Sequence, residues 1–216
     1  MSNRLKIALT KGRLQDQSVD LFEVMGLDCT PIRKPGRRLI HSIPNYPLDV
    51  VLAKAADVIT YVEHGACDLG IVGKDTMMER SRPLYEVLDL GFGCCRFALA
   101  IPKDSDFYST YRTRVIASKY PEVTRAFFEQ KGMDVNIIKI DGSVELAPLL
   151  GVADGIVDIV ETGATLRENG LIAVEDVAEV SARLIVNQAS MKLYKKEIFD
   201  FIGRCEAGQR RLKHEH

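Results

Sequence analysis

Short apolar runs alternate with segments of helical periodicity along most of this chain, and no other feature limits its fold as strongly. The expected strand and helix pairs lie at residues 5–9 and 14–25, 69–72 and 75–80, 115–117 and 121–131, and 135–140 and 145–150. Strands that alternate with helices in this way are typical of α/β folds with largely parallel sheets. We therefore expect an α/β protein.

Further apolar runs predict strands outside this alternation. Residues 39–43 and 48–52 flank a turn that contains two prolines and predict a strand pair. Other strands are expected at residues 85–90, 96–101 and 171–186. A last helix is expected at residues 192–202, with its apolar side chains on one face, and the polar residues 209–216 are expected to fray.

A Gly-x-x-Asp turn that leads into a buried strand occurs twice, at Gly65 to Asp68 and at Gly151 to Asp154. Two similar half-molecules would explain the repeat. So would the general preference for a left-handed glycine after a helix. We expect two α/β lobes around a central cleft, with strand ends that direct loops into it. Lobe I would contain residues 1–93 and 183–216, and lobe II residues 94–182.

Charge and composition exclude several classes of protein. The net charge of −1 argues against a nucleic-acid-binding surface. Residues 1–48 carry eight basic and four acidic residues, which indicates either a solvated basic face or a site for a small polyanion. No apolar run could span a membrane, and the first residues lack the apolar segment of a signal peptide, so we expect a cytoplasmic protein. Five cysteines without metal-ligand spacing are expected to be reduced thiols.

The most informative segment is a small-residue turn after the buried strand at residues 155–160. The turn consists of Thr162, Gly163, Ala164 and Thr165. Consecutive backbone N–H groups at the start of a helix, together with two hydroxyls, suit a phosphate monoester. Asp158 and Glu161 could accept hydrogen bonds from ribose hydroxyls or help to hold Mg²⁺. The same spacing also fits a threonine-capped helix after a buried strand.

The sequence around this turn resembles the signature of the ATP phosphoribosyltransferase family. The matching positions are Glu145, residues 151–153 and residues 156–166. Residues 9–14, 68–75 and 95–96 also resemble family landmarks, so the resemblance extends to about residue 203. It implies two α/β lobes similar to the type II periplasmic-binding-protein fold. It also implies an enzyme that transfers the 5-phosphoribosyl group of phosphoribosyl pyrophosphate to N1 of ATP and releases pyrophosphate, the first step of histidine biosynthesis.

The resemblance implies roles for individual residues. In lobe II, the turn at residues 162–165 would hold the 5-phosphate, while Asp158, Glu161 and Glu145 would belong to the substrate-binding set. In lobe I, the catalytic cations would act on the nucleotide and on the pyrophosphate. They are Lys11, Arg13 and Arg37, the last chosen over Arg38 in the basic loop at residues 33–38.

The resemblance also implies Mg²⁺ as the cofactor, carried by the substrate phosphates, with Asp158 or Glu161 as candidate protein ligands. Two nearby residues receive no assigned role. Lys74 precedes a short expected helix and is left undecided. Cys95 is rejected as a nucleophile because no histidine lies near it in the sequence to activate it.

Partners follow from the same resemblance. Residues 203–216 are too few for a regulatory domain, which indicates the short form of the family. Short forms associate with a separate regulatory subunit that resembles histidyl-tRNA synthetase, and we also expect self-association.

One alternative function remains open at this point. A non-enzymatic cytoplasmic module that senses a small phosphorylated anion would share the two-lobed design of solute-binding receptors. An assay of pyrophosphate release would distinguish such a module from an enzyme.

Overall fold

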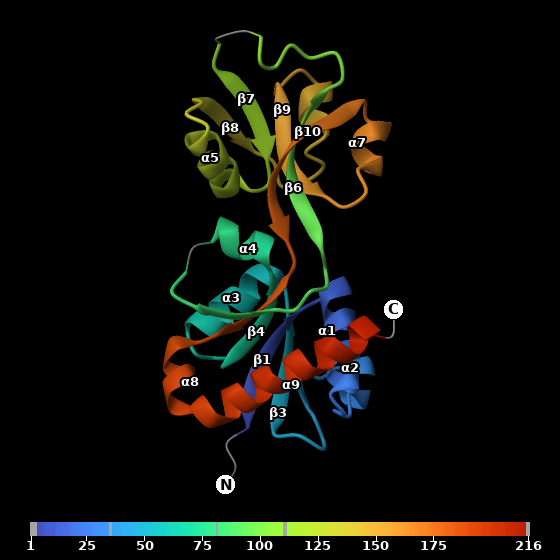
Figure 1. Cartoon of the computed structure of the whole chain (residues 1–216), viewed down its shortest axis with the longest axis vertical. Helices are drawn as coiled ribbons and strands as arrows, with labels where there is room; N and C mark the ends of the chain where they lie inside the picture. The colour runs from blue at the N-terminus through green and yellow to red at the C-terminus, as the bar shows by residue number, and fades with distance from the viewer. Residues whose placement is uncertain (1–3, 35, 81, 110–111, 215–216) are drawn as a thin grey trace. The chain divides into compact units, whose positions relative to one another are not determined.

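The computed structural model describes residues 4–34, 36–80, 82–109 and 112–214. The chain divides into two compact units, drawn in Figure 1. Unit 1 contains Met1–Met77, Ser81–Gly93 and Ser181–His216, and unit 2 contains Met78–Arg80 and Cys94–Val180. Both units combine a β-sheet with helices, which confirms the predicted α/β class.

Unit 1 is built on a six-stranded sheet in its described residues, in the order β2-β3-β1-β4-β11-β5. Its strands are β1 (Leu5–Thr10), β2 (Ile40–Ser42), β3 (Leu48–Ala53), β4 (Leu69–Gly73), β5 (Tyr85–Asp89) and β11 (Ala182–Val186). Its helices are α1 (Arg13–Val24), α2 (Thr30–Arg33), α3 (Ala55–Glu63), α8 (Gln188–Leu193) and α9 (Lys195–His214), together with the first residues of α4 (Lys74–Glu79). The middle strands β3, β1 and β4 are parallel, and β2, β11 and β5 add antiparallel pairs.

Unit 2 contains a five-stranded sheet in its described residues, in the order β10-β6-β9-β7-β8. Its strands are β6 (Cys95–Pro102), β7 (Arg114–Ser118), β8 (Val135–Lys139), β9 (Gly155–Val160) and β10 (Leu171–Val180). Its helices are α5 (Pro121–Gln130), α6 (Leu146–Leu149) and α7 (Ala164–Glu168). Strands β8, β7 and β9 are parallel, and β6 and β10 are antiparallel additions.

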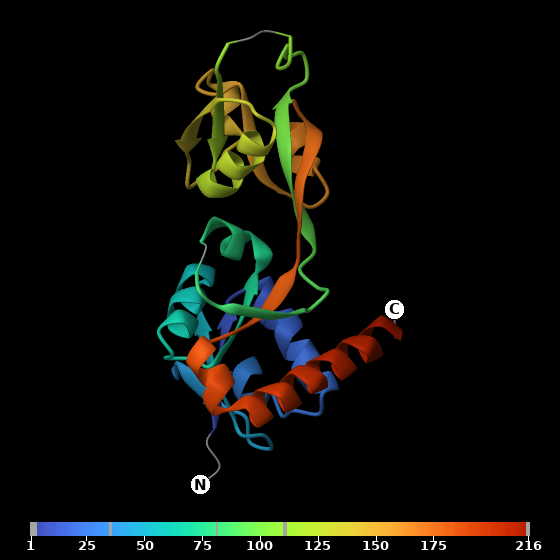
Figure 2. The same cartoon turned by 60° about the vertical axis from the view of Figure 1, so that its left-hand side comes forward.

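Apolar packing fixes the helices of unit 1 on its sheet. Helix α1 buries Val19, Leu21 and Phe22. The ring of Phe22 meets that of Phe201 in α9 edge to face, with ring centroids 5.8 Å apart. Figure 2 shows α9, in red, running beside α1, in blue. No helix among the described residues is both long enough and apolar enough to cross a membrane.

The two Gly-x-x-Asp turns occupy equivalent positions in the two units. Gly65 and Gly151 both have a left-handed φ of 69° after a helix. The N–H of Asp68 donates to the carbonyl of Lys6 (2.9 Å), and its carboxylate accepts from the Lys6 N–H (2.8 Å). Asp154 makes the same pair of bonds with Val115 (2.7 and 2.8 Å). The structure therefore supports the interpretation as two similar half-molecules.

The expectation of largely parallel sheets is wrong, because each sheet is mixed. The antiparallel strands come from residues 85–102 and 171–186, where each stretch runs from one sheet to the other without a helix, and from β2, which pairs with β3 across a short turn. Residues 171–186 are strands, as predicted, but they divide at Ser181 between the two sheets.

The predictions for the C-terminal segment also need correction. The last helical segment begins earlier than expected and is interrupted at Tyr194. Residues 209–214, predicted to fray, continue α9. The side-chain amide of Gln209 donates to the carbonyl of Asp89 (2.8 Å), and Leu212 packs on the core of unit 1. These two contacts hold a segment whose composition is otherwise polar.

Candidate functional site

A lysine follows each of the three parallel strands of unit 1. Lys11 follows β1, Lys54 follows β3 and Lys74 follows β4. The carboxyl ends of parallel strands meet at one edge of a sheet, where open α/β sheets bind ligands. The ammonium group of Lys74, however, forms an ion pair with Glu86, which also pairs with Arg183 (3.3 Å). Lys74 therefore has a structural role within unit 1.

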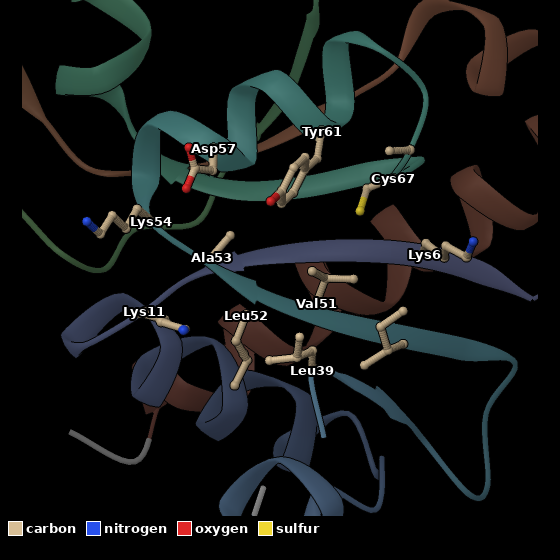
Figure 3. A pocket seen from close by; sticks show the side chains of 12 residues that line it. Lys6, Lys11, Leu39, Val51, Leu52, Ala53, Lys54, Asp57, Tyr61 and Cys67 are labelled. Carbon is tan, nitrogen blue, oxygen red and sulfur yellow. The ribbon is translucent and has the colours of Figure 1, made fainter. Parts of the chain in front are cut away.

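A first pocket of about 530 Å³ lies beside β3 and α3 (Figure 3). Lys11 and Lys54 lie at one end of it together with Asp57, and Lys6 lies at the other end near Cys67. Apolar side chains of β3 and the ring of Tyr61 line the space between. The sequence analysis did not select Lys54, although its position directly after an expected strand matches that of Lys11.

Burial raises the pKa of the Cys67 thiol to about 11, and the nearby Asp68 adds to this effect. Cys67 is therefore protonated at neutral pH, and this pocket contains no reactive thiolate. Cys29 and Cys205 are buried like Cys67.

A second pocket of about 500 Å³ adjoins the first, and Lys11, Leu39 and Leu52 line both. The second pocket brings Lys11 together with Arg37 and Arg38. The structure thus places two of the three predicted catalytic cations on one pocket. Arg13 begins α1 and is exposed, and it is not among the lining residues of either pocket.

Other cations of the basic N-terminal segment stabilise the fold. Arg4 pairs with Asp49 (2.9 Å) and donates to backbone carbonyls around the β2–β3 turn, including that of Leu48 (2.8 Å). Arg33 pairs with Glu23 (2.9 Å) and with Asp20. The cations of the basic segment therefore differ in their surroundings. Arg4 and Arg33 are structural, whereas Lys11, Arg37 and Arg38 line a pocket.

In unit 2, the small-residue turn follows the buried strand β9 directly. Gly163 has a left-handed φ of 71° and caps α7, which begins at Ala164 as predicted. The side chain of Arg167 donates from Nη1 to the Thr162 carbonyl (3.1 Å), and the Thr162 hydroxyl accepts a long hydrogen bond from the Ala164 N–H (3.4 Å). Thr165 is exposed, so its hydroxyl can reach a ligand from solvent.

Asp158 lies on β9, the strand before this turn, and two other charged residues shift its pKa. Burial raises the pKa of the half-buried Asp158, opposed by a hydrogen bond from the backbone of Ile159. The negative charge of Glu145 raises the pKa further, and the positive charge of Lys119 lowers it. Asp158 and Glu145, both predicted to bind substrate, thus lie within electrostatic range of each other, as does Lys119, which was not predicted. Lys119 follows β7 as Lys11 follows β1, and this equivalence is the signal that would have revealed it.

Glu161 and Cys95 are the remaining residues considered in the sequence. Glu161 is exposed directly after β9. Cys95 is half-buried at the start of β6. Among the described residues, no three histidine, cysteine, aspartate or glutamate side chains are grouped so that they could hold a metal ion.

The chain thus consists of two α/β units. One has a small-residue turn after a buried strand, and the other has cationic pockets. This protein has the type II periplasmic-binding-protein fold. The aliphatic sulphonate binding protein SsuA of Escherichia coli shares this fold with a TM-score of 0.62 and 12% identity, over 100% of this chain and 76% of SsuA. The ATP phosphoribosyltransferase family model matches residues 54–207, and the chain belongs to that family.

Relatives named ATP phosphoribosyltransferase support this membership. The Clostridium kluyveri protein is 56% identical over 203 residues, which are 94% of this chain and 93% of the relative. A Bacillus cereus protein is 52% identical over 94% of this chain and 95% of the relative. A chain of the ATP phosphoribosyl transferase (HisG:HisZ) complex from Thermotoga maritima has a TM-score of 0.80 and 29% identity, with 96% of this chain and 99% of that chain covered. These findings confirm the resemblance and do not favour a sensing module without catalysis.

Proposed function

We propose that this protein acts in the cytoplasm and transfers the 5-phosphoribosyl group of phosphoribosyl pyrophosphate to N1 of ATP with release of pyrophosphate, the first step of histidine biosynthesis. The observation that carries the proposal is the 56% identity to a named ATP phosphoribosyltransferase over 94% of the chain. The charges and burial of the candidate site residues support it. They also suggest which part of the substrates each unit binds.

Unit 2 would bind the ribose 5-phosphate. The turn at residues 162–165 starts a helix and has a left-handed glycine, so backbone N–H groups and the Thr165 hydroxyl can approach phosphate oxygens closely. Asp158 loses hydration where it lies and is repelled by Glu145. Ribose hydroxyls that donate to Asp158 would replace that lost hydration. Glu161, at the end of β9, would supply a further acceptor.

Unit 1 would bind the nucleotide and the pyrophosphate. Leu39, Val51 and Tyr61 in the first pocket offer apolar contacts to a flat base. Lys11 lies between the two pockets, and Lys54 and Arg37 each line one of them. These cations would compensate the charge of the phosphates. Arg13 would act from the first turn of α1, next to Lys11 in the chain.

The chemistry requires charge stabilisation and positioning. N1 of adenine carries its own lone pair, so attack on C1 of the ribose needs no protein nucleophile. As the bond to pyrophosphate breaks, negative charge grows on the leaving group, and fixed cations in a pocket stabilise it more strongly than water does. Binding two mutually repelling polyanions in fixed places also replaces a random encounter by an oriented one.

Mg²⁺ would accompany the substrate polyphosphates. Mg²⁺ is usually held by one or two carboxylates and by phosphate oxygens, rather than by a cage of protein ligands. Asp158 and Glu161 are the candidate carboxylates, Glu145 lies within electrostatic range of Asp158, and the described residues contain no group of three metal-ligating side chains. When bound, Mg²⁺ would neutralise phosphate charge.

The protein would also assemble with partners. The structurally similar Thermotoga maritima chain comes from a HisG:HisZ complex. We extend this to the present chain, with a regulatory subunit that resembles histidyl-tRNA synthetase, and we add self-association.

The direct test is incubation of the purified protein with ATP, phosphoribosyl pyrophosphate and Mg²⁺, followed by quantification of pyrophosphate and of the phosphoribosylated nucleotide. Release that requires both substrates is expected. Omission of ATP is the control, because hydrolysis of phosphoribosyl pyrophosphate alone would also release pyrophosphate. Binding of both substrates without any product would support the sensing module instead.

A further inference from the structure

A buried histidine with an unsatisfied nitrogen lies on the wall of the second pocket. His41 is the middle residue of β2, where it pairs with Val50 of β3. Its neighbours Ile40 and Ser42 are exposed, whereas His41 is only 3% exposed, as expected for alternating side chains on a strand. The imidazole is therefore held by the sheet.

The Nε2 atom of His41 is enclosed, and none of the described residues forms a hydrogen bond with it. Buried polar atoms in proteins nearly always have a partner, so an unpaired one requires an explanation. Neighbouring apolar side chains cannot satisfy a ring nitrogen. His41 lines the second pocket, so a ligand or a water molecule bound there could become the partner of Nε2 after a small shift of the side chains that close this atom off from solvent.

The charge of the second pocket identifies the chemistry of that ligand. Lys11, Arg37 and Arg38 line the pocket together with His41, and no acidic side chain is among its lining residues in the described chain. Three cations favour an anion with several oxygens. A neutral imidazole with its proton on Nε2 is a hydrogen-bond donor, and phosphoryl oxygens are acceptors.

We infer that His41 is a substrate-positioning residue that donates a hydrogen bond from Nε2 to a diphosphoryl group bound by Lys11, Arg37 and Arg38. This inference rests on the proposed function and deepens it, because it adds a directional hydrogen-bond donor to the cations that act on the pyrophosphate. Lysine and arginine side chains on a surface can follow a moving phosphate. A histidine fixed by a strand selects one position for it.

Two substitutions at His41 separate binding from folding. Leucine has a similar size and removes the ring nitrogens, whereas glutamine can place an amide N–H near the position of Nε2. His64→Gln is the matched control, since His64 is exposed at the end of α3. The probes are inorganic pyrophosphate, phosphoribosyl pyrophosphate and ATP, each titrated alone by calorimetry with Mg²⁺ present. Thermal unfolding without ligand is measured in parallel.

The expected result for His41→Leu is a loss of affinity of about 10- to 100-fold for the probe that occupies the pocket, as for one hydrogen bond to a charged group. His41→Gln should recover part of this loss, and the control should match the unaltered protein. A loss of affinity for pyrophosphate and phosphoribosyl pyrophosphate would show that the pocket binds the leaving group. A loss of affinity for ATP would show that it binds the triphosphate. The ligand-free melting temperature of His41→Leu should not fall, because the substitution removes an unsatisfied polar atom.

Two outcomes would overturn the inference. Unchanged affinity of His41→Leu for all three probes, while Arg37→Ala weakens binding, would show that His41 takes no part and would leave the proposed function standing. A lowered melting temperature of both His41 variants, with no recovery of affinity by glutamine, would make His41 a structural residue. Failure of the proposed function would look different, since the unaltered protein itself would then form no phosphoribosylated nucleotide.

Discussion

Thr165 offers the clearest test of a single residue, because it is exposed and makes little contribution to the fold. Replacing it by alanine should weaken the binding of phosphoribosyl pyrophosphate by about 10- to 100-fold, the value of one hydrogen bond to a charged phosphate. The melting temperature should stay the same. Calorimetric titration measures the affinity, with Thr60→Ala, an exposed threonine of α3, as the control. Equal affinities for both variants would remove the turn from the binding site.

Arg37 and Arg38 form a matched pair, since both are exposed and both line the second pocket. If Arg37 stabilises the developing charge of pyrophosphate, Arg37→Ala should lower kcat by about 10-fold or more and change KM less. Arg37→Lys should restore only part of the rate, because lysine lacks the planar fork of the guanidinium. Steady-state kinetics of these variants and of Arg38→Ala decide the assignment. A normal kcat for Arg37→Ala with a reduced one for Arg38→Ala would reverse it.

The residues of the site differ in how far the sequence could reveal them. The turn at residues 162–165 could be selected from the sequence because its residues are contiguous and follow a strand. Lys54 and Lys119 were missed because a lone lysine after a strand forms no motif. His41 was missed because its significance lies in burial and in an empty hydrogen-bonding position, which no spacing encodes. The ion pair of Lys74 could not be predicted, because its partner Glu86 lies on β5, away from Lys74 in the sequence.

At the scale of the elements, Asp154 joins β7 to the start of β9. Its backbone N–H and carboxylate bond to Val115, and its carboxylate pairs with Arg112. Burial tends to raise the pKa of this carboxyl, but the hydrogen bonds from Arg112 and Val115 outweigh burial, and the pKa is lowered. The charged form therefore stabilises the folded state above the pKa of the unfolded chain, about 3.9.

We predict that Asp154→Asn lowers the free energy of unfolding by about 1 to 2 kcal/mol at neutral pH. The difference should shrink as the pH falls below about 4, where the native carboxyl also becomes protonated. Urea unfolding at several pH values measures both effects. Arg112→Ala should lower the stability less than Asp154→Asn does, because that arginine is largely exposed and solvent screens its ion pair. A loss for Asp154→Asn that does not change with pH would show that charge is not the cause.

The elements were predicted well where periodicity is local and poorly where distant contacts decide. The parallel strands and the helices that follow them were predicted from the spacing of apolar residues. The start of α7 was predicted from the turn that contains Gly163. The extent of α9 does not, because Gln209 donates to Asp89, 120 positions earlier in the chain, and Leu212 packs on the core of unit 1. The mixed sheets likewise depend on which unit each half of residues 171–186 joins.

At the scale of the whole molecule, we predict that the isolated protein is insensitive to histidine and becomes inhibited only when the regulatory subunit is added. Regulation across a subunit interface is a coupling free energy, so histidine should weaken substrate binding by the same factor by which substrate weakens histidine binding. Activity assays with and without the partner, together with titration of histidine into the complex, measure both sides. Strong inhibition of the isolated protein by histidine would contradict this prediction.

The order of strands in unit 1 has a consequence for how the protein is made. Strand β5 pairs only with β11 among the described strands, and β11 is encoded after the whole of residues 94–180. On the ribosome, β5 therefore emerges long before its neighbour and stays unpaired while the later unit is translated. Most of unit 2 is one continuous segment and can fold as it leaves the exit tunnel. Vectorial synthesis thus completes the inserted unit first, and the sheet that begins the chain closes last.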